Sequence, residues 1–223
     1  MKEYLLPTYF IDSDHPSIIE FAERHCDEKT ADSEKAIRLY YKIRDSIRYN
    51  PYSIVPEKES MKASTVLKKG DGWCVAKAVL LAACLRSQGV PARLGFANVK
   101  NHLNTKRLRE LMETDLFVYH GYTDIYLNQK WVKATPAFNL TLCENFNVKP
   151  LEFDGTQDSI FHPFDKKGNR HMEYVKDHGR FSDLPWDTIL EASKRHYPEK
   201  YFARLNKANY DFAAEAKQEN VQD

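Results

Sequence analysis

The sequence lacks the features that define several large classes of protein. No segment approaches the roughly 18 consecutive apolar residues of a membrane-spanning helix. The 33 basic residues nearly balance the 32 acidic ones, and the net charge of +1 gives no electrostatic reason to expect nucleic acid or an anionic membrane as a partner. Residues 1–7 contain no long apolar core followed by a small-residue cleavage site, so no signal peptide is expected.

Cysteine is sparse, and its spacing excludes the common metal sites. No Cys-x-x-Cys and no short Cys/His pairing occurs, so zinc is not expected. The acidic residues of the 154–165 region lack the spacing of a calcium loop. The sequence therefore indicates no metal and no cofactor, and without a secretion signal we expect reduced thiols and a cytoplasmic protein. The four cysteines are Cys26, Cys74, Cys84 and Cys143.

What the sequence contains is typical of one globular α+β domain. With 223 residues, 42% of them hydrophobic and 29% charged, the chain is long enough to bury a core. Apolar periodicity predicts helices first and strands afterwards. The expected helices span residues 16–26, 31–47 and 74–88, with two more starting after residues 182 and 198, and the expected strands span 92–99, 116–127 and 131–135.

Two further segments have a less defined pattern. The charged segment 101–115 carries an apolar helical face, and this fits either an amphipathic surface connection or a lid. Residues 140–180 are polar and rich in turn residues, so we expect loops there. The chain is accordingly interpreted as a single domain, 1–223, with a core at about 35–140 and a loop-rich and helical C-terminal extension at about 141–216.

Cys74 is the first candidate for chemistry. It follows the turn-forming segment Gly70-Asp71-Gly72-Trp73 and begins an almost uninterrupted apolar helix that Gly89 ends. A thiol at a helix N-terminus faces unpaired backbone N–H groups and the positive end of the helix dipole. Both stabilise the thiolate, which is the nucleophilic form of cysteine. Cys74 is therefore the predicted nucleophile.

His120 is the predicted general base. It lies in the middle of an aromatic-rich strand, and Gly121 after it leaves room for a close approach. A histidine in mid-strand is more often a packed core residue. The order of a cysteine helix, a strand, a histidine strand, a turn and a tryptophan strand favours the catalytic interpretation.

Several spaced motifs carry a resemblance to a known family. In order they are Ile47-Arg48-Tyr49, Gly72-Trp73-Cys74, Leu85-Arg86-Ser87-Gln88-Gly89-Val90-Pro91-Ala92-Arg93, His120 and Trp131-Val132. Together they resemble the transglutaminase-like cysteine protease superfamily over about residues 35–140. The resemblance implies a papain-like fold, in which N-terminal helices pack on a small antiparallel sheet. It also implies a site made of a cysteine, a histidine and an acidic or amide third member.

One position departs from the family pattern. Thr135 stands where the family motif has aspartate before proline. A hydroxyl can accept a hydrogen bond from an imidazole N–H, but it cannot stabilise an imidazolium as a carboxylate does. Thr135 is the predicted third member, with Asn139 and Asp124 as alternatives. The Cys74 backbone N–H is the expected oxyanion donor, and Trp73 or Tyr49 is a candidate for a second donor or a wall.

The implied activity is thiol-dependent hydrolysis of a peptide or amide bond. Two other classes of function remain open on the sequence. One is a non-catalytic binding or scaffold module that retains the fold, which the loss of the aspartate favours. The other is an acyltransferase that uses the same cysteine, histidine and third residue. The sequence specifies neither the substrate nor an oligomeric state.

Overall fold

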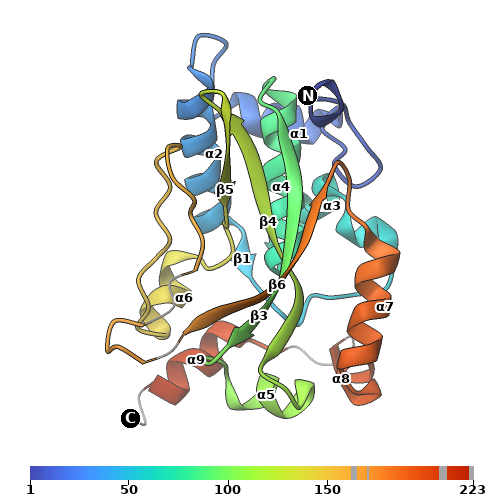
Figure 1. The fold of residues 1–223 in the computed structure, drawn as a ribbon, viewed down its shortest axis with the longest axis vertical. Helices are drawn as coiled ribbons and strands as arrows, with labels where there is room; N and C mark the ends of the chain where they lie inside the picture. The colour runs from blue at the N-terminus through green and yellow to red at the C-terminus, as the bar shows by residue number, and fades with distance from the viewer. Residues whose placement is uncertain (162–164, 170, 206–209, 221–223) are drawn as a thin grey trace.

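The protein folds as an α+β molecule, as its sequence predicts (Figure 1). The computed structural model describes residues 1–161, 165–169, 171–205 and 210–220. The helices are η1 Lys2–Tyr4, α1 Pro16–Glu23, α2 Asp32–Ser46, η2 Lys58–Met61, α3 Ala63–Lys69, α4 Cys74–Ser87, α5 Lys106–Met112, α6 Leu140–Asn145, α7 Trp186–His196, α8 Glu199–Leu205 and α9 Phe212–Asn220. The strands are β1 Arg48–Tyr49, β2 Asp71–Gly72, β3 Ala92–Asn101, β4 Leu116–Leu127, β5 Lys130–Ala134 and β6 Met172–Phe181.

The main sheet is antiparallel, with the strand order β5-β4-β3-β6. The tight turn between β4 and β5 places both Asn128 and Gln129 at positive φ, which favours a two-residue hairpin. β3 and β4 pair in regular register from Ala92 opposite Ile125 to Ala97 opposite His120, and a bulge follows. A second, two-stranded parallel pair, β1 with β2, places Tyr49 opposite Gly72, two residues before Cys74.

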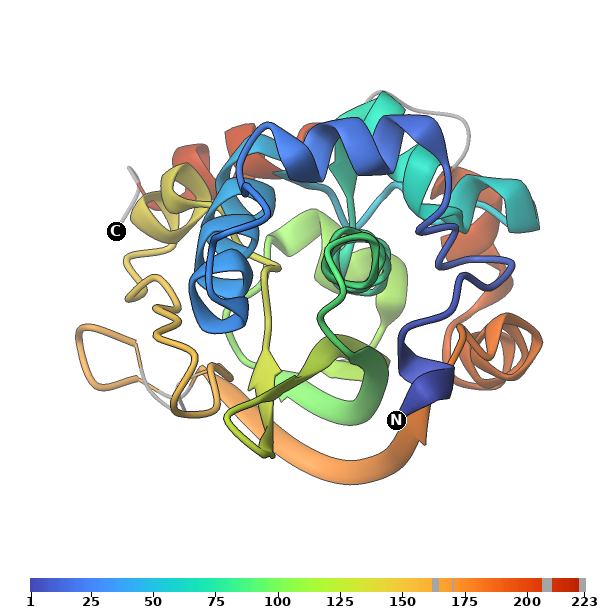
Figure 2. The same ribbon diagram turned by 90° about the horizontal axis from the view of Figure 1, so that it is seen from above.

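α4 is the central helix of the molecule. Seen end-on, it is enclosed by α1, α2 and α3 on one side and by the curved sheet on the other (Figure 2). Its first thirteen residues, Cys74 to Arg86, are all buried. A helix that is apolar on every side is typical of one surrounded by protein. Among the described residues, no helix is both long and apolar enough to cross a membrane.

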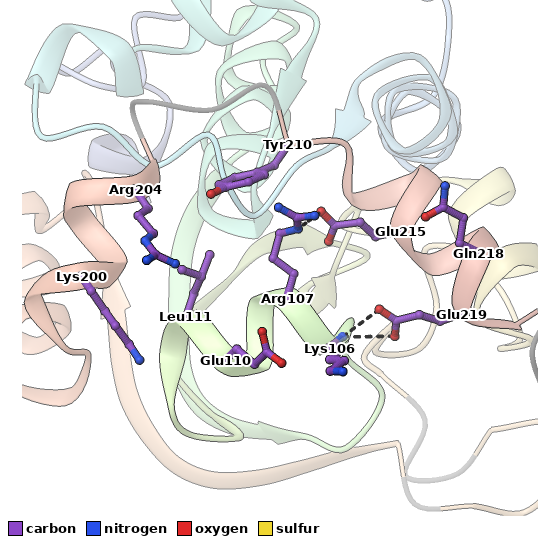
Figure 3. A pocket seen from close by; sticks show the side chains of 10 residues that line it. All are labelled: Lys106, Arg107, Glu110, Leu111, Lys200, Arg204, Tyr210, Glu215, Gln218 and Glu219. Carbon is purple, nitrogen blue, oxygen red and sulfur yellow. Dashed lines mark hydrogen bonds and ion pairs between the residues drawn. The ribbon is translucent and has the colours of Figure 1, made fainter.

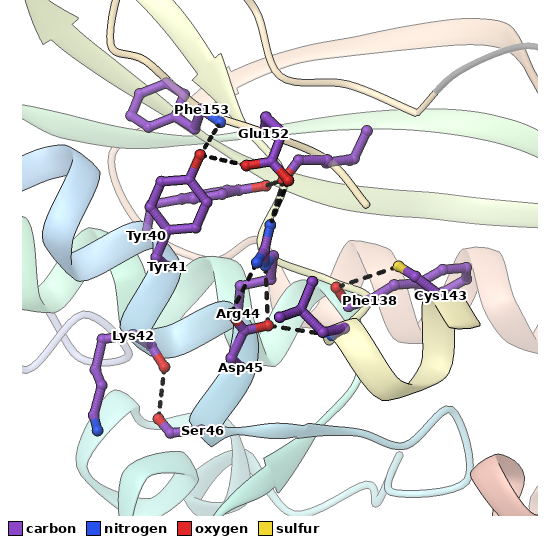
Figure 4. A network of polar contacts seen from close by, with 12 residues as sticks. Tyr40, Tyr41, Lys42, Arg44, Asp45, Ser46, Phe138, Cys143, Glu152 and Phe153 are labelled. Atoms are coloured by element: carbon purple, nitrogen blue, oxygen red, sulfur yellow. Dashed lines mark hydrogen bonds and ion pairs between the residues drawn. The ribbon is translucent and has the colours of Figure 1, made fainter. Parts of the chain in front are cut away.

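A polar network on α2 fixes the segment that follows the hairpin (Figure 4). The buried guanidinium of Arg44 donates to the carbonyl oxygen of Leu151 at 2.8 Å and pairs with Asp45. Asp45 also accepts from the Leu140 backbone N–H at the start of α6. Because the guanidinium has several partners, its burial leaves no isolated charge. The network holds residues 140–151 against the helical layer.

The structure corrects the expectation for residues 140–180. This region contains helix α6 and the fourth strand, β6, where we had expected loops. β6 is an edge strand with mostly exposed side chains, and Gly179 within it has a φ of 90°. Such a strand buries too little apolar surface to show the alternation that identifies a half-buried strand. Cys143, expected in a loop, lies in α6.

Several predicted helix boundaries also shift. The helix expected at 16–26 ends at Glu23, and the helix expected at 31–47 covers Asp32–Ser46. The helix after residue 182 begins at Trp186, with Pro185 at its N-cap. After Pro198 the chain forms two helices, α8 and α9, rather than one. α8 and α9 lie at the end of the molecule toward which the first turn of α4 points (Figure 1).

Candidate active site

Cys74 is the first residue of α4, as predicted. Trp73 is the N-cap residue in an extended conformation, and Gly72 precedes it in β2. A Cβ added to Gly72 would lie 2.9 Å from the Cβ of Ala76, so only glycine fits against the first turn of the helix. The turn and the helix therefore place the Cys74 sulfur at a helix N-terminus, where orphan N–H groups favour negative charge.

β4 meets the start of α4 at the residue after His120. A Cβ on Gly121 would lie 3.0 Å from the Cα of Val75, and the Gly121 backbone N–H is directed at the Cys74 sulfur. Tyr119, on the other side of His120, has a φ of 54°, and the bulge in the β3–β4 register lies beside it. The close contact of β4 with α4 brings the strand of the predicted base to the predicted nucleophile.

Burial makes both candidate groups neutral. The side chains of Cys74 and His120 are each only 4% exposed. Burial raises the pKa of the Cys74 thiol to about 12, although the backbone N–H groups of Gly121, Val75 and Cys74 itself act in the opposite direction. Burial also lowers the pKa of His120 to about 4. The conformation described here therefore contains a neutral thiol and a neutral imidazole rather than a thiolate–imidazolium pair.

Thr135 lies one residue beyond β5 and is buried. Its hydroxyl oxygen and the Nε2 atom of His120 are both buried without a hydrogen-bond partner in the part of the chain that the structure describes. The predicted hydrogen bond between Thr135 and the imidazole is thus not formed in this conformation. Two unpaired buried polar atoms cost folding free energy, which is typical of a functional site.

The two alternatives to Thr135 are engaged elsewhere. The side-chain oxygen of Asn139 accepts a hydrogen bond from the Tyr49 backbone N–H at 3.2 Å. Asp124 forms ion pairs with Arg93 at 2.8 Å and with Arg180 at 3.4 Å. Thr135 therefore remains the candidate third member with an uncommitted hydroxyl.

A comparison with protein families shows which family the chain belongs to. The family model of the transglutaminase-like superfamily matches residues 19–136. The chain belongs to the transglutaminase-like superfamily. The matched region contains α4 with Cys74, β4 with His120, and Thr135. It begins earlier than the core that the sequence motifs delimit, because it includes most of α1.

Solved structures show more distant similarity. A proposed cysteine protease from Cytophaga hutchinsonii is 16% identical, with a TM-score of 0.46, and the match covers 80% of this chain and 53% of that protein. A proposed protease from Parabacteroides distasonis is 19% identical, with a TM-score of 0.39, and the match covers 56% of this chain and 24% of that protein. This chain thus spans about half the length of the first and a quarter of the second. No curated protein matches it.

This member of the transglutaminase-like superfamily has candidate oxyanion donors at the start of α4. The backbone N–H groups of Cys74 and Val75 lower the pKa of the Cys74 thiol, as donors directed toward the sulfur do. The indole Nε1 of Trp73 is buried and has no hydrogen-bond partner among the described residues. An unpaired indole N–H beside Cys74 in the sequence keeps Trp73 as a candidate donor, since an oxyanion needs a donor that is free before the reaction.

Lys77 is a structural residue that the sequence interpretation missed. It is fully buried, and its Nζ atom donates to the carbonyl oxygens of Arg44 at 2.9 Å, Ile47 at 2.6 Å and Ala137 at 2.8 Å. These three acceptors match the three protons of an ammonium group. Burial lowers the pKa of Lys77 to about 7. A charge in the first turns of an otherwise apolar helix was the available signal, because a buried charge needs dedicated partners.

Besides Tyr49, which the sequence suggested, two tyrosines that the sequence interpretation missed are within electrostatic range of the Cys74 thiol. The pKa values of Tyr49, Tyr197 and Tyr201 are all raised, first by burial, and a negative charge on Cys74 would raise them further. The Tyr197 hydroxyl accepts from the Val118 backbone N–H on β4 at 2.8 Å. Tyr197 and Tyr201 come from the C-terminal third, about 120 residues after Cys74, and no local pattern predicts that contact.

The donor groups of the site fit no metal ion. Among the residues that the structure describes, no group of three or more His, Cys, Asp or Glu side chains is close enough to hold one. All four cysteines are free and buried.

Proposed function

We propose that this chain is a thiol-dependent hydrolase of peptide or amide bonds, with Cys74 as nucleophile and His120 as general base. The observation that carries the proposal is the close contact between the start of α4 and the His120–Gly121 segment, with the Gly121 N–H directed at the sulfur. Membership of the transglutaminase-like superfamily supports the same chemistry. Four free cysteines suit a reducing compartment such as the cytoplasm.

The proposed reaction has two steps. His120 takes the thiol proton as the Cys74 sulfur forms a bond to the carbonyl carbon, and the protonated imidazole then gives this proton to the leaving amine as the C–N bond breaks. The backbone N–H groups at the start of α4 and the Trp73 indole N–H stabilise the oxyanion. His120 then takes a proton from water as the water oxygen forms a bond to the acyl carbon, the C–S bond breaks, and the imidazolium returns the proton to the Cys74 sulfur. In the reacting conformation, the Thr135 hydroxyl, which has no hydrogen-bond partner among the described residues, would move to accept from the second ring nitrogen and so orient the ring.

A specific observation also favours a second candidate, a non-catalytic module. Burial holds the Cys74 pKa at about 12 and the His120 pKa at about 4, and both shifts oppose formation of the reactive ion pair. In that case Cys74 and His120 are core residues, and the thiol is unreactive because it is buried and protonated. The two candidates differ in whether any peptide bond is cleaved.

The first prediction tests the nucleophile and the third residue together. Incubation with a defined peptide library, followed by mass spectrometry, measures cleavage. Cys74→Ser should lower cleavage by at least about 10³-fold, because the hydroxyl is a far weaker nucleophile at neutral pH. Thr135→Val keeps the shape of the side chain and should lower cleavage by about 10-fold or more if the hydroxyl sets the tautomer of His120.

Two controls define the outcomes. Cys84→Ser changes a buried cysteine on the same helix and should leave cleavage intact if the chain folds. Thr123→Val removes a buried hydroxyl that donates to the Ala78 carbonyl oxygen and controls for loss of a structural hydrogen bond. Full cleavage by Cys74→Ser, or no cleavage by the unaltered chain under any condition, contradicts the proposed hydrolase.

A further inference from the structure

A ring from the C-terminal helix fills an aromatic pocket next to the site. Phe212, the first residue of α9, is 3% exposed. Its ring centroid lies 5.9 Å from that of Tyr49, 6.0 Å from that of Tyr52 and 5.5 Å from that of Phe146. These distances are typical of packed aromatic pairs. Without Phe212, these three rings would line a hollow on the catalytic core.

Tyr49 connects this pocket to the nucleophile. It pairs with Gly72 in the β1–β2 ladder, two residues before Cys74. A charge on the Cys74 sulfur would contribute to the raised pKa of Tyr49, after the larger effect of burial. The pocket that Phe212 fills therefore includes a residue paired with the strand that leads into Cys74. Tyr197 and Tyr201, from the same C-terminal third, are also within electrostatic range of the thiol.

Polar contacts hold α9 in place. The Glu215 carboxylate accepts from the Tyr52 hydroxyl at 2.7 Å and from the Thr105 hydroxyl at 3.1 Å, and it pairs with Arg107 at 2.8 Å. The Asn145 side chain also donates to the Ala213 carbonyl oxygen at 2.9 Å. α9 is thus attached to the core by one buried ring and a group of polar contacts on one helix face.

The outer part of this contact is open and charged (Figure 3). A cavity of about 540 Å³ lies between α5, α8 and α9. Its walls include Lys106, Arg107, Lys200 and Arg204, facing Glu215 and Glu219. The exposed side chains of Lys106, Lys200 and Arg204 contribute little to stability because water screens them, so the polar attachment of α9 depends mainly on the partly buried Glu215. With one main polar anchor and few buried residues, helix α9 is suited to local release while the rest of the molecule stays folded.

A nucleophile that is only 4% exposed cannot approach the carbonyl of a polypeptide. We propose that α9 is a removable intramolecular cover, in which Phe212 occupies the pocket that receives a large apolar side chain of the substrate. The role of the pocket in binding substrate rests on the hydrolase proposed above. The release of α9 does not rest on it, because release exposes the Cys74 thiol whether or not that thiol catalyses a reaction.

The test measures how fast iodoacetamide alkylates Cys74 in the full chain, by mass spectrometry of its peptide. Cys84 lies on the same helix, is fully buried and serves as an internal reference for global unfolding. Phe212→Ala should raise the Cys74 rate about 10-fold or more while the Cys84 rate stays unchanged, since only local opening is affected. Glu215→Gln weakens the polar anchor and should act in the same direction.

Matched variants control for lost stability and lost charge. Phe21→Ala removes a ring of equal size from α1, and Glu191→Gln changes an exposed carboxylate that pairs with Arg195. Both should leave the ratio of the Cys74 rate to the Cys84 rate unchanged. If the alkylation rates of Cys74 and Cys84 rise equally in Phe212→Ala and in Glu215→Gln, α9 is not a cover. The proposal also fails if Cys74 in the unaltered folded chain is alkylated as fast as in the chain unfolded by urea.

A small ligand tests the apolar pocket. In Phe212→Ala, N-acetylphenylalanine amide should slow the alkylation of Cys74, and N-acetylalanine amide should not, because only the former carries a ring that replaces Phe212. Equal effects of the two amides overturn the assignment of the pocket. If Phe212→Ala exposes Cys74 but no variant cleaves any peptide, the hydrolase fails and the cover stands.

Discussion

At the scale of single residues, the site combines two features that usually exclude each other. Its thiol has the backbone surroundings of a nucleophile, but burial gives it the pKa of an inert cysteine. The same burial keeps the imidazole of His120 neutral. A neutral pair needs no counter-charge, so the site remains stable without solvent until a substrate or an opening motion changes its surroundings.

His120 should make the fold sensitive to acid. Its pKa is about 4 in the folded protein against an ordinary value of 6.5 for a histidine in water, so between these values the unfolded chain binds a proton that the folded chain does not. Stability should therefore fall as the pH falls from about 6.5 to about 4 and then level off. At 1.36 kcal/mol per pKa unit, the loss is at most about 3 kcal/mol.

His120→Gln carries no titrating ring and should show a smaller loss over the same pH range in urea denaturation. His196→Gln, which changes an exposed histidine at the end of α7, is the control and should behave like the unaltered protein. An identical pH dependence in His120→Gln and the unaltered protein would show that His120 titrates normally in the fold.

The sequence predicted the elements of the site better than its internal contacts. Cys74 was predictable because two glycines, a capping position and an apolar run define a helix start within a few residues. The missing hydrogen bond of the Thr135 hydroxyl was not predictable, because a hydrogen bond depends on angles that β5 and the following turn set together. Lys77 was visible as a charge in an apolar helix, but its three carbonyl partners come from two distant segments.

At the scale of elements, the contact between β4 and α4 determines the geometry of the site. Gly121→Ala would place a Cβ 3.0 Å from both the Cα and the Cγ2 of Val75, and backbone cannot move aside as a flexible side chain does. The variant should lose about 1–3 kcal/mol of stability. It should also displace the Gly121 N–H from the Cys74 sulfur. Urea denaturation measures the first effect, and the alkylation rate of Cys74 measures the second.

Gly89→Ala is the control for Gly121→Ala, because it introduces backbone strain without crowding a neighbouring atom. Gly89 has a φ of 76° and no neighbouring atom within 4 Å of the added Cβ, so the change should cost about 1 kcal/mol without altering Cys74. If Gly121→Ala changes neither stability nor Cys74 reactivity, the contact between β4 and α4 is looser than its geometry indicates.

The helices and strands of the core follow from local pattern, whereas the C-terminal elements do not. α2 has an apolar stripe, α4 is an almost continuous apolar run, and β3 and β4 are rich in residues that favour strands; their positions agree with the sequence within a few residues. Packing against distant elements, rather than a local sequence pattern, determines where β6 and α9 form. β6 adds an edge to β3, and α9 inserts one ring among aromatic residues from distant segments. Tertiary contacts of this kind leave little periodicity in the sequence.

At the scale of the whole molecule, a single hydrophobic core extends from α1 to α9. The same cluster contains the helical layer around α4 and the C-terminal residues Tyr201 and Phe212. Continuity of the core does not require uniform stability, because elements with few buried residues open locally below the free energy of global unfolding. α4 is buried along almost its whole length, whereas α9 buries mainly Phe212 and Ala216.

Hydrogen exchange should reveal this difference directly. The backbone amides of α4 should exchange only through global unfolding, and those of α9 should exchange faster by about 10-fold or more, through local opening. Pulse labelling with peptides that cover Cys74–Ser87 and Phe212–Asn220 measures both in one experiment. Phe212→Ala should accelerate exchange in α9 and leave α4 unchanged. Equal protection of α4 and α9 in the unaltered chain would mean that the cover opens only when the whole protein unfolds, and release of α9 would then be no route for a substrate to reach Cys74.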